Sequence, residues 1–231
     1  MSVHRSLRDQ MRLPLVREAG AAPFVRSPAN GFAVEALAGW PDQAGQVMAL
    51  CGPAGCGKSH LAAIWAERVG AIPLNGAEAA QADPLELEGR PVLLDIARDA
   101  DDETLFHLIN LSQQDGGALL MVSRPSPRHW RVAVPDLRSR LDAVRVVAMD
   151  APDDAVLSAI LAARFAERSI TPGEGVIDYL VRRIDRSAAA AAGVVERLDA
   201  EHRPVTRSLA RQVLDAGDDL FDDTRGSGLQ P

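Results

Sequence analysis

The chain has 231 residues, of which 47% are hydrophobic and 4% aromatic, and its 25 basic and 32 acidic side chains give a net charge of −7. This length allows one large domain, or a domain with a small appendage, and the apolar fraction supports a sizeable core. The acidic balance argues against a strong duplex-DNA binder, which ordinarily presents a basic face. No apolar run reaches the roughly 18 residues of a membrane-spanning helix, and the N-terminus lacks an apolar leader core. We therefore expect a cytoplasmic protein with no membrane partner.

The first 22 residues have no sustained helical or strand periodicity, so we interpret 1–22 as a flexible tail. Within it, Gln10 is followed by the apolar stretch Leu13, Pro14 and Leu15. The residue before a proline is driven out of the helical region, so this stretch is extended. An extended apolar segment in a tail is suited to insertion into a pocket on a partner protein. The alternative is that it packs on its own domain.

One motif dominates the chain, and its eight residues fit the pattern G-x-x-x-x-G-K-[ST]: Gly52, Pro53, Ala54, Gly55, Cys56, Gly57, Lys58 and Ser59. An apolar run at 47–51 predicts a buried strand before it, and apolar spacing over 60–69 predicts a helix after it. A glycine-rich turn of this kind brings backbone N–H groups and a helix N-terminus to a phosphate. Lys58 then reaches the β- and γ-phosphates, and the Ser59 hydroxyl holds Mg²⁺. The motif predicts a nucleotide-binding site.

Alternating strands and helices continue to residue 151. We expect a helix over 30–37, strands over 71–74, 91–96, 118–122 and 145–149, and a helix over 101–114, with an acidic, turn-rich stretch at 77–90. Asp95 ends the third strand, where a carboxylate is suited to hold Mg²⁺, although an Asp that caps a turn remains an alternative. Ser123 ends the fourth strand and is a candidate to sense a γ-phosphate, or a simple turn residue. The arginine-rich segment before the last strand includes a short expected helix over 136–141.

After Pro152 the apolar period becomes helical throughout, and four helices follow. This change of pattern predicts an α/β domain over 23–151 and a small all-helical lid domain over 152–216. Acidic and glycine-rich residues predict a disordered tail over 217–231. The fold class is therefore α/β, with a parallel five-stranded sheet covered by helices on both faces and a helical domain at the C-terminal end.

These features together resemble the DnaA/Hda family of AAA+ ATPases, over roughly residues 8–215. The resemblance rests on the order of several short segments along one chain: Gln10 with Leu13-Pro14-Leu15, Trp40-Pro41, Gly-Lys-Ser-His-Leu at 57–61, Leu-Phe-His-Leu-Ile-Asn at 105–110, Asp-Leu-Arg-Ser-Arg-Leu at 136–141, and Pro-Asp-Asp at 152–154. It implies ADP or ATP with Mg²⁺ as cofactors. It also implies that Asn30 and His60 belong to the nucleotide-binding residues and that Ser123 is the sensor.

For partners, the resemblance implies docking of Gln10, Leu13, Pro14 and Leu15 on the DNA polymerase sliding clamp. It makes Arg140 an arginine finger, which acts on nucleotide held by a neighbouring subunit, here the initiator DnaA. A homodimer stays open as well. Because no further domain is expected after Leu214, the initiator's DNA-binding domain is expected to be absent.

Two departures from the family pattern concern hydrolysis by the chain itself. The family's third strand usually ends in two adjacent acids, whereas here Asp95 is followed by Ile96. The nucleotide-contacting arginine of the family's lid falls near Val194, and Arg186 is the nearest candidate. Both departures predict a weak ATPase at most.

The sequence therefore favours a regulator of chromosomal replication initiation that docks on the clamp and stimulates DnaA to hydrolyse its ATP through Arg140. One alternative is an AAA+ helicase-loader ATPase, which needs competent hydrolysis of its own. The other is a small P-loop kinase, which the C-terminal run of helices does not favour.

Overall fold

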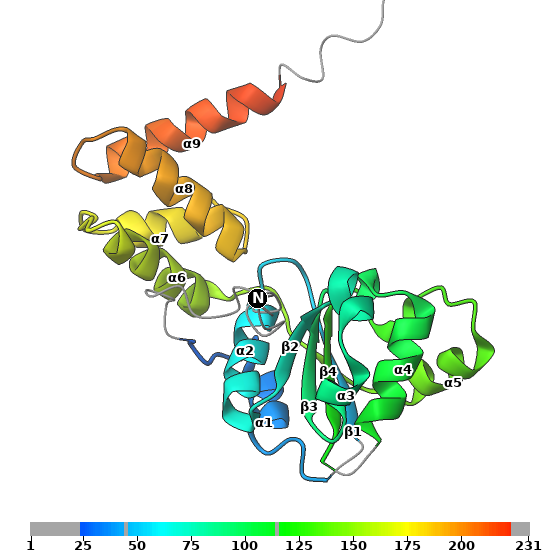
Figure 1. The fold of residues 1–231 in the computed structure, drawn as a ribbon. Helices are drawn as coiled ribbons and strands as arrows, with labels where there is room; N and C mark the ends of the chain where they lie inside the picture. The colour runs from blue at the N-terminus through cyan, green and yellow to red at the C-terminus, as the bar shows by residue number, and fades with distance from the viewer. Residues whose placement is uncertain (1–23, 44–45, 114–115, 223–231) are drawn as a thin grey trace, which may run out of the picture. The chain divides into compact units, whose positions relative to one another are not determined.

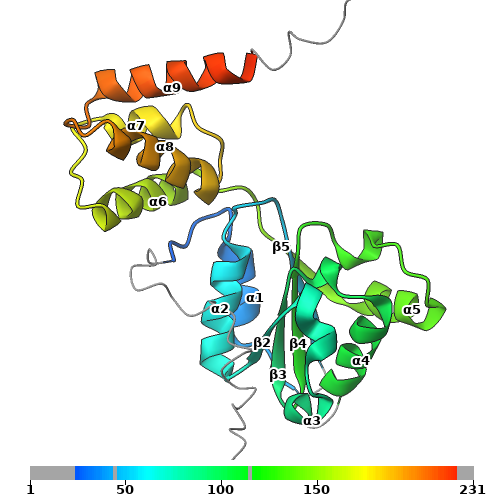
Figure 2. The ribbon, with the colours of Figure 1, turned by 45° about the horizontal axis from the view of Figure 1, so that its top comes forward.

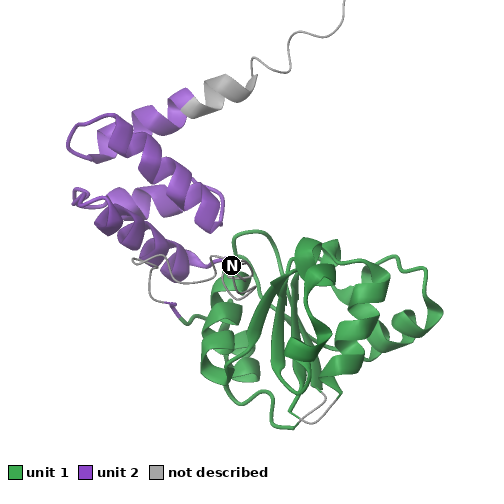
Figure 3. Ribbon diagram, viewed as in Figure 1, with its two compact units in different colours: residues 1–19, 26–151 green, residues 20–25, 152–231 purple. Residues whose placement is uncertain are grey.

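The computed structural model describes residues 24–43, 46–113 and 116–222, with side chains described as far as 216. The chain forms two compact units, one over residues 26–151 and the other from Pro152 onwards. Figure 3 colours the first, α/β unit green and the second, helical unit purple. We describe each unit by itself.

The α/β unit is built on five parallel strands: β1 (Gln46–Cys51), β2 (Ile72–Asn75), β3 (Pro91–Asp95), β4 (Ala118–Ser123) and β5 (Arg145–Ala148). Their order in the sheet is β2-β3-β4-β1-β5, and every pair is parallel. Val47 of β1 pairs with Leu119 of β4, and Leu50 pairs with Val122. Because β4 lies between β1 and β3, the residues that end these three strands meet at one edge of the sheet.

Helices cover both faces of this sheet (Figure 1). Helices α1 (Gly31–Ala38) and α2 (Lys58–Val69) lie on one face, and α3 (Pro84–Leu87), α4 (Asp102–Ser112) and α5 (Pro135–Ala143) lie on the other. Figure 2 shows the same two layers after rotation. The described residues of the unit also include the 3₁₀ turns η2 (Gly76–Gln81), η3 (Ala97–Asp99) and η4 (Pro127–His129). The parallel five-stranded sheet with helices on both faces is thus confirmed.

Alternate strand residues supply the core beneath α4 and α5. Ala49, Leu94 and Met121 are buried there against Leu105 of α4 and Leu141 of α5. A strand projects successive side chains to opposite faces, so a parallel sheet covered on both sides needs apolar residues throughout. Asp101 is the N-cap of helix α4, and its carboxylate accepts the N–H of Thr104 at 2.8 Å. This capping lowers the pKa of Asp101 through hydrogen bonds from the Thr104 backbone and hydroxyl.

The helical unit contains α6 (Asp154–Glu167), α7 (Val176–Val181), α8 (Ala188–Ala200) and α9 (Arg207–Asp222). Its own core includes Leu157, Phe165, Leu180 and Val195. Asp153 caps α6 and Ser187 caps α8, each by accepting a backbone N–H three residues ahead.

The structure differs from the sequence-based expectation in two segments. The stretch 77–90 contains the short helix α3, whose Leu87 is buried in the core. Helix α9 runs to Asp222, beyond residue 217, where the disordered tail was expected to begin. A glycine inside a helix costs about 1 kcal/mol, and Gly217 therefore weakens this helix without ending it.

Candidate nucleotide-binding site

The glycine-rich loop between β1 and α2 needs backbone conformations that favour glycine. The φ angles are 155° at Gly52, 71° at Gly55 and 94° at Gly57. Gly52 is also sterically constrained, since a Cβ atom there would lie 2.3 Å from the carbonyl oxygen of Met149. The Met149 N–H donates to the Cys51 carbonyl at 2.8 Å, which ties the start of the loop to the end of β5. The loop is therefore fixed at its first residue.

Lys58 is the first residue of α2 and is only 8% exposed. Its ammonium group donates to the carbonyl oxygen of Pro53 at 2.6 Å and lies 3.6 Å from the Cys56 sulfur. These contacts place a positive charge inside the loop, at the N-terminus of a twelve-residue helix. The helix dipole favours an anion at the same place.

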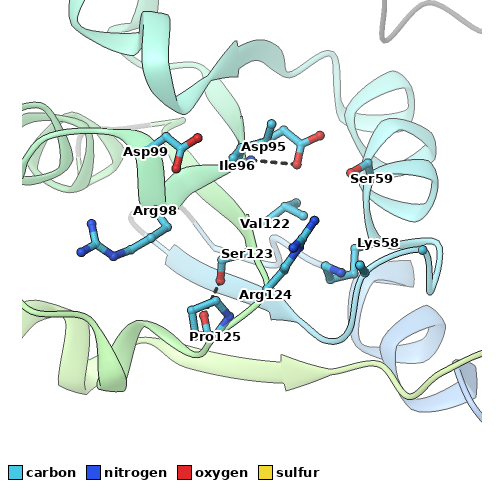
Figure 4. A pocket seen from close by; sticks show the side chains of 12 residues that line it. Lys58, Ser59, Asp95, Ile96, Arg98, Asp99, Val122, Ser123, Arg124 and Pro125 are labelled. Atoms are coloured by element: carbon cyan, nitrogen blue, oxygen red, sulfur yellow. Dashed lines mark hydrogen bonds between the residues drawn. The ribbon is translucent and has the colours of Figure 1, made fainter. Parts of the chain in front are cut away.

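A pocket with a volume of about 540 Å³ opens at the edge where β1, β3 and β4 end (Figure 4). Its wall contains Ala54, Gly55, Lys58, Ser59, Asp95, Ile96, Arg98, Asp99, Val122, Ser123, Arg124 and Pro125. Four side chains singled out from the sequence thus come together here: Lys58, Ser59, Asp95 and Ser123. Their individual roles stay predictions.

Ser123 is buried at the tip of β4 and is held by local contacts. Its hydroxyl donates to the Pro125 carbonyl at 2.7 Å and lies 3.5 Å from the Cys51 sulfur. Burial raises the pKa of the Cys51 thiol, although the hydrogen bond with Ser123 and the charge of Lys58 act in the opposite direction. Cys51 and Cys56 are both free thiols and both buried. Cys51 therefore acts as a small core residue beside the site.

The oxygen atoms in the pocket are of the kind that Mg²⁺ prefers. One carboxylate oxygen of Asp95 accepts the N–H of Ile96 at 2.8 Å, and the other oxygen accepts no backbone N–H of the residues that the structure describes. Ser59 adds an exposed hydroxyl on the same wall. Within the described ranges, no cluster of three or more His, Cys, Asp or Glu side chains is arranged to hold a metal. One carboxylate and one hydroxyl fit an ion that takes its other ligands from phosphate and water.

Ile96 stands where the family pattern has a second acid. Its φ is 50°, in the left-handed region that β-branched residues rarely adopt, and its side chain is 48% exposed on the pocket wall. The chain therefore presents an apolar group to the pocket directly after Asp95. This observation supports the expectation of weak hydrolysis.

Sequence reasoning missed three charged residues of the pocket, Arg98, Asp99 and Arg124. Each follows the end of a strand by no more than four residues, since β3 ends at Asp95 and β4 at Ser123. That position was the available signal, because loops after parallel strands form the ligand edge of such sheets.

Arg140 lies on α5 and is not among the residues that line this pocket. Its guanidinium stacks over the ring of Phe106 on α4, with 5.0 Å between the guanidinium carbon and the ring centroid. Within the part of the chain that the structure describes, it makes no hydrogen bond or ion pair. Arg138, two residues earlier, is bound tightly: it pairs with Asp142 and donates to the carbonyls of Pro127 and Trp130.

Asn30 and His60 belong to the α/β unit but do not line the pocket. Asn30 is buried, and its side-chain oxygen accepts the N–H of Ser27 at 2.9 Å. His60 is half-buried on α2 and is not part of the pocket wall. Arg186 belongs to the helical unit, where it pairs with Asp154 and donates to the Pro152 carbonyl at 3.1 Å. The predicted clamp-binding residues lie outside the described residues: Gln10, Leu13, Pro14 and Leu15.

Among the described residues, none of the helices is both long and apolar enough to cross a membrane.

Comparison with protein-family models gives no match. Comparison with curated sequences gives the chromosomal replication initiator protein DnaA. The chain is 27% identical to DnaA of Thermomicrobium roseum over 125 residues, which cover 52% of this chain and 27% of that protein. It is 24% identical to DnaA of Roseiflexus castenholzii over 263 residues, covering all of this chain and 54% of that protein. The chain thus spans about half or less of these relatives.

Solved structures give the same fold. Domain III of DnaA from Thermotoga maritima matches with a TM-score of 0.69 at 18% identity, covering 84% of this chain and 94% of that one. A replication initiator DnaA bound to AMPPCP and single-stranded DNA matches with a TM-score of 0.67 at 18% identity, covering 88% and 70%. Sequence and fold agree: the chain is similar to DnaA in sequence, and it has the fold of the solved DnaA structures.

Proposed function

We propose that the pocket at the ends of β1, β3 and β4 binds ATP or ADP with Mg²⁺. The support is the meeting of a buried lysine, a helix N-terminus, a hydroxyl and a carboxylate at one sheet edge. A DnaA structure of the same fold binds the ATP analogue AMPPCP, which agrees with this proposal. In the bound state, Lys58 and the loop N–H groups contact the phosphates, and Ser59 and Asp95 hold the ion.

The second part of the proposal is that Arg140 acts on nucleotide bound to another protein. The observation that carries it is the contrast between Lys58, which is enclosed in its own pocket, and Arg140, which lies outside that pocket with its N–H groups unoccupied in the described chain. An arginine placed on a transferring phosphoryl group stabilises the developing charge and contributes about 10³–10⁵ in rate. Stacking on Phe106 holds the guanidinium without consuming these donors.

The resulting function is that of an Hda-like regulator of replication initiation. In this proposal the partner is the initiator DnaA, and Arg140 stimulates hydrolysis of its ATP. Gln10, Leu13, Pro14 and Leu15 dock the chain on the DNA polymerase sliding clamp in the cytoplasm. The apolar Ile96 beside Asp95 favours a regulator over a helicase loader, because a loader needs to hydrolyse ATP efficiently itself.

The experiment measures phosphate release from purified DnaA loaded with ATP after addition of this chain, with and without clamp assembled on DNA. We expect fast release only when this chain and the loaded clamp are both present, and loss of the clamp effect after deletion of residues 1–20. Turnover of the isolated chain at about 1–10³ per second would instead favour the loader. Stimulation that does not depend on the clamp would remove the docking part of the proposal.

A further inference from the structure

Arg124 lines the pocket from the end of the central strand β4. It directly follows Ser123, the last residue of β4, and β4 lies between β1, which leads into the phosphate loop, and β3, which ends at Asp95. A residue at this tip therefore stands between the loop and the carboxylate. In Figure 4 the Arg124 side chain extends between Val122 and Lys58 towards the middle of the pocket.

The guanidinium of Arg124 has no protein acceptor in the described part of the chain. Asp95 and Asp99 line the same pocket, yet neither forms an ion pair with it. Arg138 of the same unit, by contrast, contacts two carbonyls and a carboxylate. Arg124 thus presents five N–H donors to the pocket space with no internal partner.

Arg98 provides an internal comparison. It lines the same pocket from η3, is also exposed, and is likewise without an ion pair among the described residues. Its side chain, however, extends away from Lys58 and Ser123 in Figure 4. Two arginines of equal charge therefore border one pocket, and only Arg124 points into it.

We propose that Arg124 binds the terminal phosphate of a nucleoside triphosphate within its own chain and so makes the pocket prefer triphosphate over diphosphate. The inference rests on the proposed nucleotide-binding function. The backbone N–H groups of the phosphate loop hold the phosphates nearer the nucleoside, and Lys58 reaches the β- and γ-phosphates. Arg124, at the tip of β4, then adds a second cation at the terminal phosphate. A guanidinium matches two phosphate oxygens with two parallel N–H donors. A diphosphate leaves that contact unmade.

The test compares the affinities of AMPPCP and ADP, each with Mg²⁺, by isothermal titration calorimetry on the whole protein. We expect the wild type to bind AMPPCP more tightly than ADP. Arg124→Ala is expected to weaken AMPPCP about tenfold or more, the usual worth of a charge-assisted hydrogen bond, and to leave ADP within about twofold. The AMPPCP affinity of Arg124→Lys is expected to lie between those of the wild type and Arg124→Ala, because an ammonium supplies charge without two parallel N–H donors.

Arg98→Ala is the matched control, because it also removes one positive charge from the pocket wall, and it is expected to leave the ratio of the AMPPCP and ADP affinities unchanged. If Arg98→Ala and Arg124→Ala lost the same AMPPCP affinity, the effect would come from the net charge of the pocket wall and not from a contact of Arg124, and the inference would be overturned. An unchanged ratio of affinities in both Arg124 variants would overturn it as well. If the wild type binds neither nucleotide, the proposed function itself fails. If it binds both, and the Arg124 substitutions leave the ratio of the AMPPCP and ADP affinities unchanged, only this inference fails. Thermal unfolding of each variant verifies that the fold is retained.

Discussion

Two cationic regions of the α/β unit are constructed in opposite ways. In the pocket, Lys58 is buried, and a backbone carbonyl of its own loop holds its ammonium group. On α5, Arg140 is half-buried and rests on an aromatic ring that leaves its N–H donors free in the described chain. The first arrangement lies in the pocket and suits a ligand bound within the same chain. The second lies outside the pocket and suits an acceptor on another molecule. In the proposed function, Lys58 therefore serves nucleotide binding and Arg140 serves stimulation of the partner.

The largest effect is expected at Arg140. Arg140→Ala should reduce stimulation of DnaA ATP hydrolysis about 10³-fold, because it removes the charge that stabilises the transferring phosphoryl group. Arg140→Lys should fail largely too, since one ammonium does not reproduce a planar guanidinium. Stimulation is measured as single-turnover phosphate release from DnaA.

Nucleotide affinity should be unchanged in both Arg140 variants, because the side chain lies outside the pocket. Arg131→Ala serves as the control, as Arg131 is an exposed arginine of the segment before α5. If Arg140→Ala stimulated DnaA as strongly as the wild type does, the proposed role of Arg140 in stimulation would be contradicted.

Lys58→Ala tests the other region and should weaken nucleotide binding about 100-fold or more, since no other group inside the loop carries a charge to the phosphates. Affinity for fluorescent ADP gives the measurement, and circular dichroism shows whether the fold is kept. Retained affinity would show that the pocket does not use its phosphate loop.

Gly52→Ala should destabilise the α/β unit by about 2–4 kcal/mol, because its Cβ would lie 2.3 Å from a backbone oxygen. Gly193→Ala on α8 is the matched control. No atom lies within 4 Å of its added Cβ, so the change should stabilise by about 0.5–1 kcal/mol. Free energies of unfolding in urea provide the comparison, and equal effects of the two substitutions would refute the steric argument.

Arg138→Ala should cost about 1–3 kcal/mol, since it removes the side-chain donor to the Trp130 carbonyl and to the Asp142 carboxylate and leaves the Pro127 carbonyl with the Trp130 N–H alone. Its effect on stimulation should be smaller than that of Arg140→Ala. If Arg138→Ala left stability unchanged but abolished stimulation, the roles of the two arginines would have to be exchanged.

Much of the fold follows from local pattern. The five strands were predicted because each is an apolar run, as a strand buried on both faces requires, and Asp95 and Ser123 were found because they end such runs. The parallel sheet then brings them to one edge beside Lys58. The direction of Arg124 and the backbone strain at Ile96 have no local signature, because they depend on strand order and on contacts distant in sequence. The same holds for two acceptors of Arg138, the carbonyls of Pro127 and Trp130, which lie outside its helix.

The most direct test is a structure of this chain in complex with DnaA and AMPPCP on a loaded clamp. The account predicts that an N–H group of Arg140 lies about 2.7–3.1 Å from a γ-phosphate oxygen of the nucleotide held by DnaA. It would be contradicted if Arg140 stayed remote from that nucleotide and no residue of this chain contacted its γ-phosphate.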